Sequence, residues 1–177
     1  MNKVEQFRYD VLERLRNNFD ALGEAAILRD PMKDIPTHML NVLHTELGYG
    51  EEEVMGEYYF LPLAGENKYH LFSSVLTLTE EMPDNRYDIL GQAANALNFF
   101  LPVGSLVFSR AEGIMAYKYT SLIPVEATIE EALKVIDGNI GLSLHIVDQY
   151  VDQLMKLMQG DIEWEDFLDI LPEAYRS

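Results

Sequence analysis

The fold of this chain is decided by the stretch TIEEALKVIDGNIGLSLHIVDQYVDQLMKLMQG, from Thr128 to Gly160. Thr128 and Glu131 form the pattern of an N-terminal capping box, and Gly160 supplies the residue that commonly ends a helix. A helix of this length is about 45 Å long, so it needs a sheet or a partner beneath it. Its apolar residues recur every three or four positions, which predicts one long amphipathic helix: Ile129, Leu133, Ile136, Ile140, Leu144, Val147, Val151, Leu154 and Met158.

The length and composition of the chain predict a single globular domain. Its 177 residues are enough for one sizeable core and few for two, so we expect one domain over residues 1–177. The first turns, Met1–Arg8, mix charges where a signal peptide would need an unbroken apolar run, which favours a cytoplasmic location. The chain has no cysteine, which excludes disulfides, zinc–thiolate sites and thiol nucleophiles.

The charge balance is strongly acidic. Thirty acidic side chains against thirteen basic ones give a formal net charge of -17. Such a charge repels phosphate backbones and anionic lipid surfaces, so we expect neither nucleic acid nor a membrane as a partner. A basic protein surface would be attracted instead, although solubility alone also explains the acidity.

The remaining elements follow from periodicity and from turn residues. An apolar stripe from Val4 to Leu22, closed by Gly23, predicts a first helix, whereas Pro31 and Pro36 favour an irregular connection over Glu24–Pro36. Residues 38–47 suit a helix or a strand; we choose the strand because a turn and an aromatic segment follow and complete a hairpin. The other predicted elements are strands at Val54–Leu63, Lys68–Thr79, Gly104–Ser109 and Gly113–Ile123, a turn at Gly65–Asn67, a helix at Asp84–Leu101 and a short acidic helix at about 161–171.

This order predicts an α+β fold: helix, three strands, helix, two strands and a long C-terminal helix. Consecutive strands without helical crossovers pair antiparallel, so we expect a five-stranded antiparallel sheet. Both faces of the predicted strands are apolar, because Tyr58 and Phe60 alternate with Tyr59 and Leu61. Either the helices divide between the two faces of the sheet, or one face meets another chain.

Familiar catalytic motifs are missing from the sequence. The histidines His38, His44, His70 and His145 lack metal-site spacing, and Glu51-Glu52-Glu53 lacks the pattern of a calcium loop. His145 with Asp148 could face one cation on the long helix, but a surface pair of polar residues is the better explanation. There is also no nucleophile elbow, phosphate-binding loop or dinucleotide fingerprint. We therefore expect no cofactor, no metal and no catalytic residue.

Tyrosine is the distinctive residue of the predicted strands. Of ten tyrosines in the chain, several fall on strands, where they provide the large amphipathic contacts that interfaces favour. Ordinary strand propensity accounts for at least half of them. The residues predicted to bind a partner are Tyr59, Leu61, Tyr69, Leu71, Val75, Tyr117 and Tyr119.

The segment NFFLPVGSLVF, from Asn98 to Phe108, carries a resemblance to a known family. It resembles the helix-to-strand junction of the type III secretion chaperone-like families, including the YbjN-type proteins, in which an asparagine ends the middle helix and a Leu-Pro-x-Gly-like turn leads to a hairpin. The resemblance implies a five-stranded antiparallel sheet, an extended client segment and a homodimer. The middle helix would contribute to the dimer interface, through Tyr87, Leu90, Ala94, Leu97 and Leu101.

The sequence thus favours a non-enzymatic protein-binding module, chaperone-like or regulatory, that acts as a homodimer on a protein or peptide client. An acidic immunity-like or antitoxin-like inhibitor of a basic enzyme is the alternative, because the charge of the chain suits it. An enzyme without a familiar motif is a third interpretation. A deep pocket with converging carboxylates would favour that interpretation.

Overall fold

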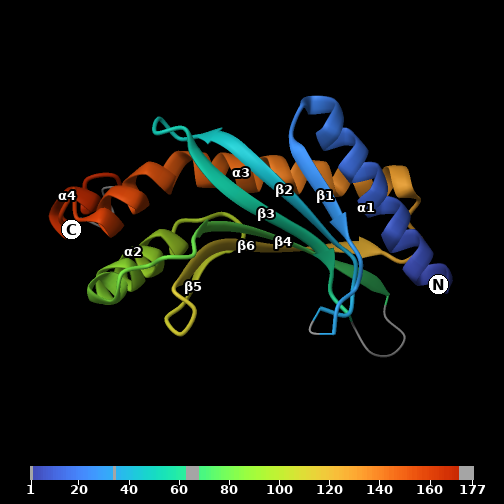
Figure 1. Ribbon diagram of the computed structural model, residues 1–177, viewed down its shortest axis with the longest axis horizontal. Helices are drawn as coiled ribbons and strands as arrows, with labels where there is room; N and C mark the ends of the chain where they lie inside the picture. The colour runs from blue at the N-terminus through green and yellow to red at the C-terminus, as the bar shows by residue number, and fades with distance from the viewer. Residues whose placement is uncertain (1, 34, 63–67, 172–177) are drawn as a thin grey trace.

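The computed structural model describes residues 2–33, 35–62 and 68–171. The strands form one antiparallel sheet in the order β1-β2-β3-β4-β6-β5 (Figure 1). The predicted turn at Gly65–Asn67 and the Leu63 end of its preceding strand lie outside the described residues. The elements are α1 (Lys3–Leu22), β1 (Ala25–Arg29), β2 (Met39–Leu47), β3 (Glu52–Phe60), β4 (Tyr69–Thr79), the short 3-10 helix η1 (Asp84–Arg86), α2 (Tyr87–Asn98), β5 (Ser105–Ser109), β6 (Ile114–Pro124), α3 (Ile129–Gln159) and α4 (Trp164–Leu168).

The long helix α3 begins and ends where the sequence predicts. The Glu131 amide donates to Thr128 Oγ1, and the Thr128 amide donates to Glu131 Oε2 at 2.8 Å, which completes the capping box. Gly160 ends the helix with a φ of 83°, a left-handed conformation that glycine adopts without steric cost. The α+β class, the antiparallel pairing and the long helix are therefore confirmed.

The expectation of five strands is wrong, because the connection predicted to be irregular contains a sixth strand, β1. The order is thus helix, four strands, helix, two strands and long helix. Ala25 and Ala26 have weak strand propensity, and five residues are too few to show alternation. The strand exists because it pairs with β2 from Ala25 opposite Leu43 to Arg29 opposite Met39.

Two helical boundaries also differ from the prediction. The α2 helix ends at Asn98, before the predicted Leu101, because the Asn98 side chain turns to the neighbouring strand. The predicted C-terminal helix shortens to α4, with Phe167 buried and stacked on Trp164. Residues 38–47, ambiguous in the sequence, form the strand β2.

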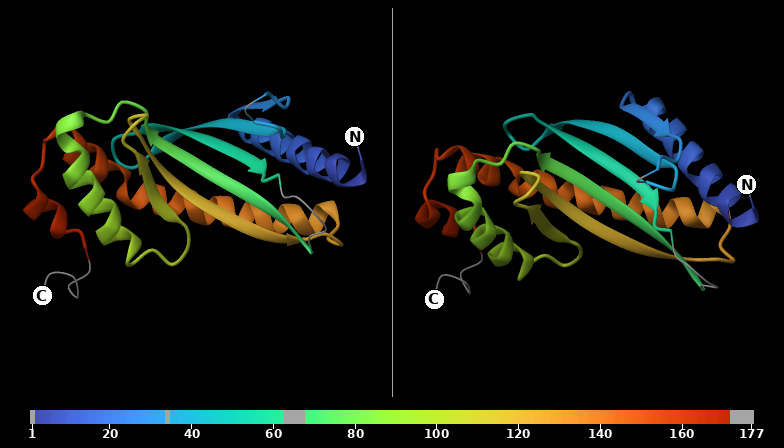
Figure 2. Two further views of the ribbon diagram at one scale, coloured as in Figure 1. Left: turned by 90° about the horizontal axis from the view of Figure 1, so that it is seen from below. Right: turned by 60° about the horizontal axis from the view of Figure 1, so that its bottom comes forward.

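The long helices α1 and α3 lie on the same face of the sheet (Figures 1 and 2). α1 packs over β1, β2 and β3, and α3 packs over β6, β4 and β2. α2 lies at the β5 end, where it contacts β5 and α3. No helix of the described residues lies over the opposite face of the sheet, which is nearer the viewer in Figure 1. The helices therefore do not divide between the two faces.

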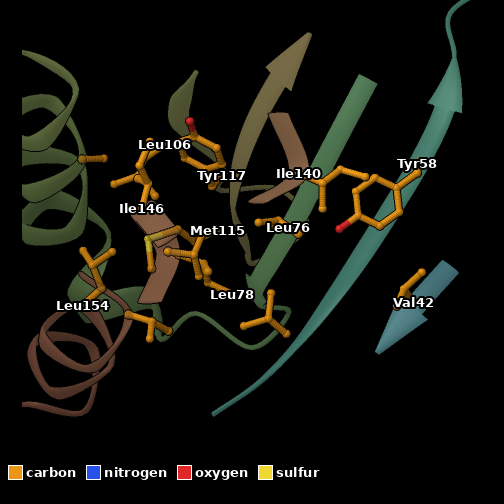
Figure 3. Packing of buried hydrophobic residues seen from close by; sticks show 14 of the residues in the cluster. Val42, Tyr58, Leu76, Leu78, Leu106, Met115, Tyr117, Ile140, Ile146 and Leu154 are labelled. Carbon is orange, nitrogen blue, oxygen red and sulfur yellow. The ribbon is translucent and has the colours of Figure 1, made fainter. Parts of the chain in front are cut away.

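The core fills the layer between the sheet and these helices. Figure 3 shows Tyr58, Leu76 and Tyr117 from the sheet in the same cluster as Ile140 and Ile146 from α3. All three sheet side chains are fully buried. Each such large side chain contributes roughly 1.5–3 kcal/mol on burial, so this layer holds the sheet to its helices.

Candidate functional site

We call the helix-free side of the sheet the open face. Because successive side chains of a strand alternate between faces, the register of the sheet assigns each residue to one face. Val42, Tyr58 and Leu76 belong to the helix face, so the residues between them point the other way. The open face comprises Ile27 and Arg29 of β1; Met39, Asn41 and Leu43 of β2; Met55, Glu57 and Tyr59 of β3; Leu71, Ser73, Val75 and Thr77 of β4; Ala116, Lys118, Thr120 and Leu122 of β6; and Ser105 and Val107 of β5.

Large apolar side chains are exposed on the open face. Ile27 is 60% exposed and Leu122 is 59% exposed, and Val107 is also exposed. Between them lies a half-buried set: Leu43, Met55, Tyr59, Leu71 and Val75. An apolar surface that spans several adjacent strands is typical of an interaction site, whereas single exposed apolar residues are ordinary.

Two polar atoms on this face have no hydrogen-bond partner in the part of the chain that the structure describes. Asn41 Oδ1 and Ser73 Oγ are buried, and neither has a hydrogen-bond partner among the described residues. Buried polar atoms are normally paired, so these two atoms are exceptions within the sheet.

The charged groups Glu57 and Lys118 lie in one row across the open face. Glu57 pairs in register with Val75, and Val75 pairs with Lys118, so one strand separates the two charges. Burial raises the pKa of the Glu57 carboxyl above its usual value and the negative charge of Glu80 adds to this, while Arg29 acts against it. No ion pair forms to Glu57 or Lys118 from the part of the chain that the structure describes.

The structure divides the residues predicted to bind a partner. Tyr59, Leu71 and Val75 lie on the open face, and Tyr69 at the start of β4 is exposed. Leu61 follows β3, where its amide donates to the Leu71 carbonyl at 2.9 Å. Tyr117 and Tyr119 belong to the opposite face of β6.

These two tyrosines are not surface groups of the open face. Tyr117 is fully buried, and its hydroxyl donates to the Val103 carbonyl at 2.7 Å. Tyr119 is half-buried and packs against the core. Their placement corrects the prediction that both tyrosines bind a partner on the exposed sheet. Side chains alternate along β6, and the odd-numbered ones from Tyr117 onward point to the face that α3 covers.

The α2 residues predicted at a dimer interface lie inside the subunit. Tyr87, Leu90, Ala94 and Leu97 are buried in the core, and Leu101 packs against it. Their apolar stripe is therefore used within the chain. A contact through α2 would have to use its other side, where Asp88, Gln92 and Asn95 are exposed and Phe99 follows at 79% exposure.

A shallow groove lies between α2 and the β5–β6 hairpin. Its lining includes Tyr87, Asp88, Phe108 and Arg110, with the Arg110 guanidinium 4.9 Å from the centre of the Tyr87 ring. Asp88 is the one carboxylate in this lining, so the groove does not bring carboxylates together. This geometry does not match the deep pocket with converging acids that would favour an enzyme.

Glu24, His44 and Tyr58 form a buried polar chain that sequence reasoning missed. Glu24 Oε2 lies 2.6 Å from His44 Nδ1, and His44 Nε2 lies 2.7 Å from the Tyr58 hydroxyl. Burial raises the pKa of Tyr58 far above its usual value, and burial lowers the pKa of His44 even though Glu24 opposes this. His44 is 2% exposed and Tyr58 is fully buried, so a substrate has no access to this acid–imidazole–hydroxyl arrangement.

The acidic side chains on α3 have a structural use. Asp148 accepts a hydrogen bond from the Gly48 amide at 2.8 Å, and Asp152 accepts from the amides of Tyr49 and Gly50 at 2.7 and 3.0 Å. These contacts hold the tip of the β2–β3 hairpin against α3. Across the described residues, no group of three metal-ligating side chains comes together.

None of the described helices is both long and apolar enough to cross a bilayer, α3 included. No protein-family model matches this chain, and no curated protein matches it either.

Proposed function

We propose that this chain is a non-enzymatic protein-binding module, chaperone-like or regulatory, that acts in the cytoplasm as a homodimer and binds protein through its open face. The observation that carries the proposal is the uncovered apolar surface of the sheet, from Ile27 on β1 to Leu122 on β6. Removing apolar surface from water contributes about 25 cal/mol per Å². A polypeptide that covers this face therefore gains free energy that the isolated subunit leaves unused.

The β5 edge of the sheet favours binding of a partner at the open face, because a side chain of α2 hinders the addition of a further strand there. Asn98 Nδ2 donates to the Leu106 carbonyl at 2.9 Å, and the Leu106 amide donates to Asn98 Oδ1 at 2.7 Å. The side-chain amide thus occupies both outward backbone groups of Leu106, the second residue of this edge strand. Covering an edge in this way is how proteins prevent unwanted strand pairing.

Suppression of aggregation tests the proposed function directly. A chemically denatured model protein is diluted into buffer with or without the chain, and light scattering is followed. Leu122→Ser should weaken the suppression, because it removes an exposed apolar contact from the open face. Leu22→Ser is the matched control, since Leu22 is 77% exposed at the end of α1, away from this face. Equal suppression by both variants and the native chain, or no suppression by any, would contradict the proposal.

A second candidate function is an acidic inhibitor of a basic enzyme, and the tip of the β2–β3 hairpin favours it. Tyr49 is fully exposed there, and the acidic residues Glu46, Glu51 and Glu53 lie close to it in the chain. An exposed aromatic side chain in acidic surroundings suits a basic cleft. Association with such a partner would slow steeply as salt rises, whereas apolar binding at the open face would change little.

A further inference from the structure

The open face is self-complementary about one particular axis. Its two charges, Glu57 and Lys118, lie on β3 and β6 at equal register distance from Val75 of β4, which lies between them. A two-fold axis that lies in the plane of a sheet-on-sheet contact, along β4, places β3 of one copy over β6 of the other. Glu57 of each copy then faces Lys118 of the partner subunit.

We propose that a second copy of this chain is the partner of the open face, packed sheet to sheet about a two-fold axis along β4 above Val75, with two reciprocal Glu57–Lys118 ion pairs. This inference rests on the proposed function, because it takes the open face as the binding surface and names its occupant. A client and the second copy then compete for the same face, so a client binds when the dimer separates. Packed sheets align within about 30° of each other, so the axis tilts slightly from the direction of β4.

The neighbouring rows of the open face match under the same axis. In the row of Thr77, Leu43 meets Val107 of the partner subunit and Met55 meets Ala116 of the partner subunit, so apolar groups meet apolar groups. In the row of Val75, Asn41 meets Ser105 of the partner subunit. The side-chain amide of Asn41 thereby meets a hydroxyl, so a polar group faces a polar group.

Other axes give poorer contacts. An axis along β3 would set Glu57 against its own copy, and an axis along β6 would do the same for Lys118. An axis between β3 and β4 would place Glu57 over Val75. Like charges in contact are destabilising, and a buried charge without a partner is costly, so the axis along β4 is preferred among the axes that run parallel to the strands.

The size and charge of the open face suit such a dimer. A two-fold axis along β4 places β3 over β6 and β2 over β5 and leaves β1 outside the contact, so five strands face the partner subunit. They span roughly 24 Å by 30 Å, which approaches the interface area of about 800 Å² per partner. Arg29 and Lys118 offset the charge of Glu57 and of Glu53, the β3 residue that precedes Val54 and points to the same face, while Glu80 adds one further negative charge near Glu57. At physiological salt, charges separated by more than about 8 Å are largely screened.

Charge exchange on the full chain tests the inference. The native chain should be a dimer by light scattering at tens of micromolar in 0.15 M salt. Glu57→Lys and Lys118→Glu should each raise the dimer Kd roughly tenfold or more, because like charges then face each other twice. An equimolar mixture of the two variants should restore a dimer, and native mass spectrometry with one variant isotope-labelled should show that it is the mixed species.

Matched controls are available on other surfaces. Glu126→Lys and Lys134→Glu make the same changes of net charge at exposed residues, after β6 and on α3, and should leave the dimer Kd unchanged. A native chain that is monomeric, a dimer insensitive to both exchanges, or a mixture that stays monomeric would overturn the inference. A monomer that suppresses aggregation through Leu122 would overturn the dimer and leave protein binding at the open face standing.

A cross-link provides a second measurement that does not depend on charge. The chain lacks cysteine, so Val75→Cys introduces a unique thiol on the proposed axis. Packed sheets lie about 10 Å apart, too far for a disulfide but within reach of a short bis-maleimide. Val75→Cys should cross-link to itself, and Val107→Cys, off the axis on the same face, should not. The reverse pattern, or equal cross-linking of both, would contradict the axis.

Discussion

His44 Nδ1 lies 2.6 Å from Glu24 Oε2. This contact joins Glu24, the residue just before β1, to β2. His44 is almost fully buried, whereas the side chain of Glu24 is 30% exposed. Among the described residues, the imidazole has its Nδ1 at ion-pair distance from Glu24 and its Nε2 hydrogen-bonded to the Tyr58 hydroxyl.

The first prediction concerns pH. Burial lowers the pKa of His44 in the folded chain below the ordinary value of 6.5, so the unfolded chain binds this proton more readily. The pKa of His70 is lowered in the same direction, by burial and by the neighbouring Arg8. Stability should therefore be lost as pH falls below about 6.5. Thermal melts at pH 7.5 and 5.5 should show a lower Tm at pH 5.5, with a smaller difference in His44→Gln. An unchanged difference in that variant would assign the effect to other groups.

The second prediction concerns the space around this polar chain. A Cβ at Gly56 would lie 2.8 Å from His44 Nε2 and 2.8 Å from the Tyr58 hydroxyl, so Gly56→Ala should displace the bond between them. We expect a loss of about 1–3 kcal/mol in the free energy of unfolding. The control is Gly138→Ala on α3, where a Cβ meets nothing within 4 Å. That change should stabilise the chain by about 0.5–1 kcal/mol. Urea titration of both variants measures the change in the free energy of unfolding. Destabilisation by both changes would contradict the prediction.

The third prediction concerns the hairpin tip. Asp152→Ala removes the acceptor of the Tyr49 and Gly50 amides, so these amides should exchange with deuterium faster than in the native chain. Because the tip adopts left-handed backbone at Gly48 and Glu51, it depends on these contacts to hold one conformation. Asp161→Ala, just after α3, should leave tip exchange unchanged. A rate at Tyr49 unaffected by Asp152→Ala would show that the turn is stable without α3.

The fourth prediction concerns the edge of the sheet. Asn98→Ala leaves both the amide and the carbonyl of Leu106 without their partner, which should cost about 1–3 kcal/mol. It should also expose the β5 edge, so concentrated samples should form larger species in light scattering over time. Asn95→Ala, at an exposed position one turn earlier in α2, is the control and should do neither. A variant at Asn98 that stays as stable as the control would contradict the role of this side chain.

The sequence predicted the elements whose signals are local. The capping box at Thr128 and the left-handed Gly160 delimit α3, and the stripe from Val4 to Leu22 delimits α1. Each of these signals depends on residues within a few positions of one another. The antiparallel class followed as well, because consecutive strands without crossovers leave few other arrangements.

The face of the sheet on which each strand residue lies, and the pairing of the strands, could not be predicted in the same way. β1 is a strand because β2 lies beside it, and Tyr117 is buried because α3 covers its side of β6. A shift of one residue in register reverses the face of every side chain, and a sequence with apolar residues on both faces does not show which one the helices cover. Glu24, His44 and Tyr58 likewise meet only when α1 and three strands are in place.

The sequence by itself thus determined α1 and α3 with their ends, and the antiparallel class, since these depend on backbone conformation and periodicity over short distances. Only the tertiary structure decided which face of the sheet is covered, which tyrosines are buried and where the polar chain lies. The physical reason is that these properties depend on contacts between residues far apart in the chain.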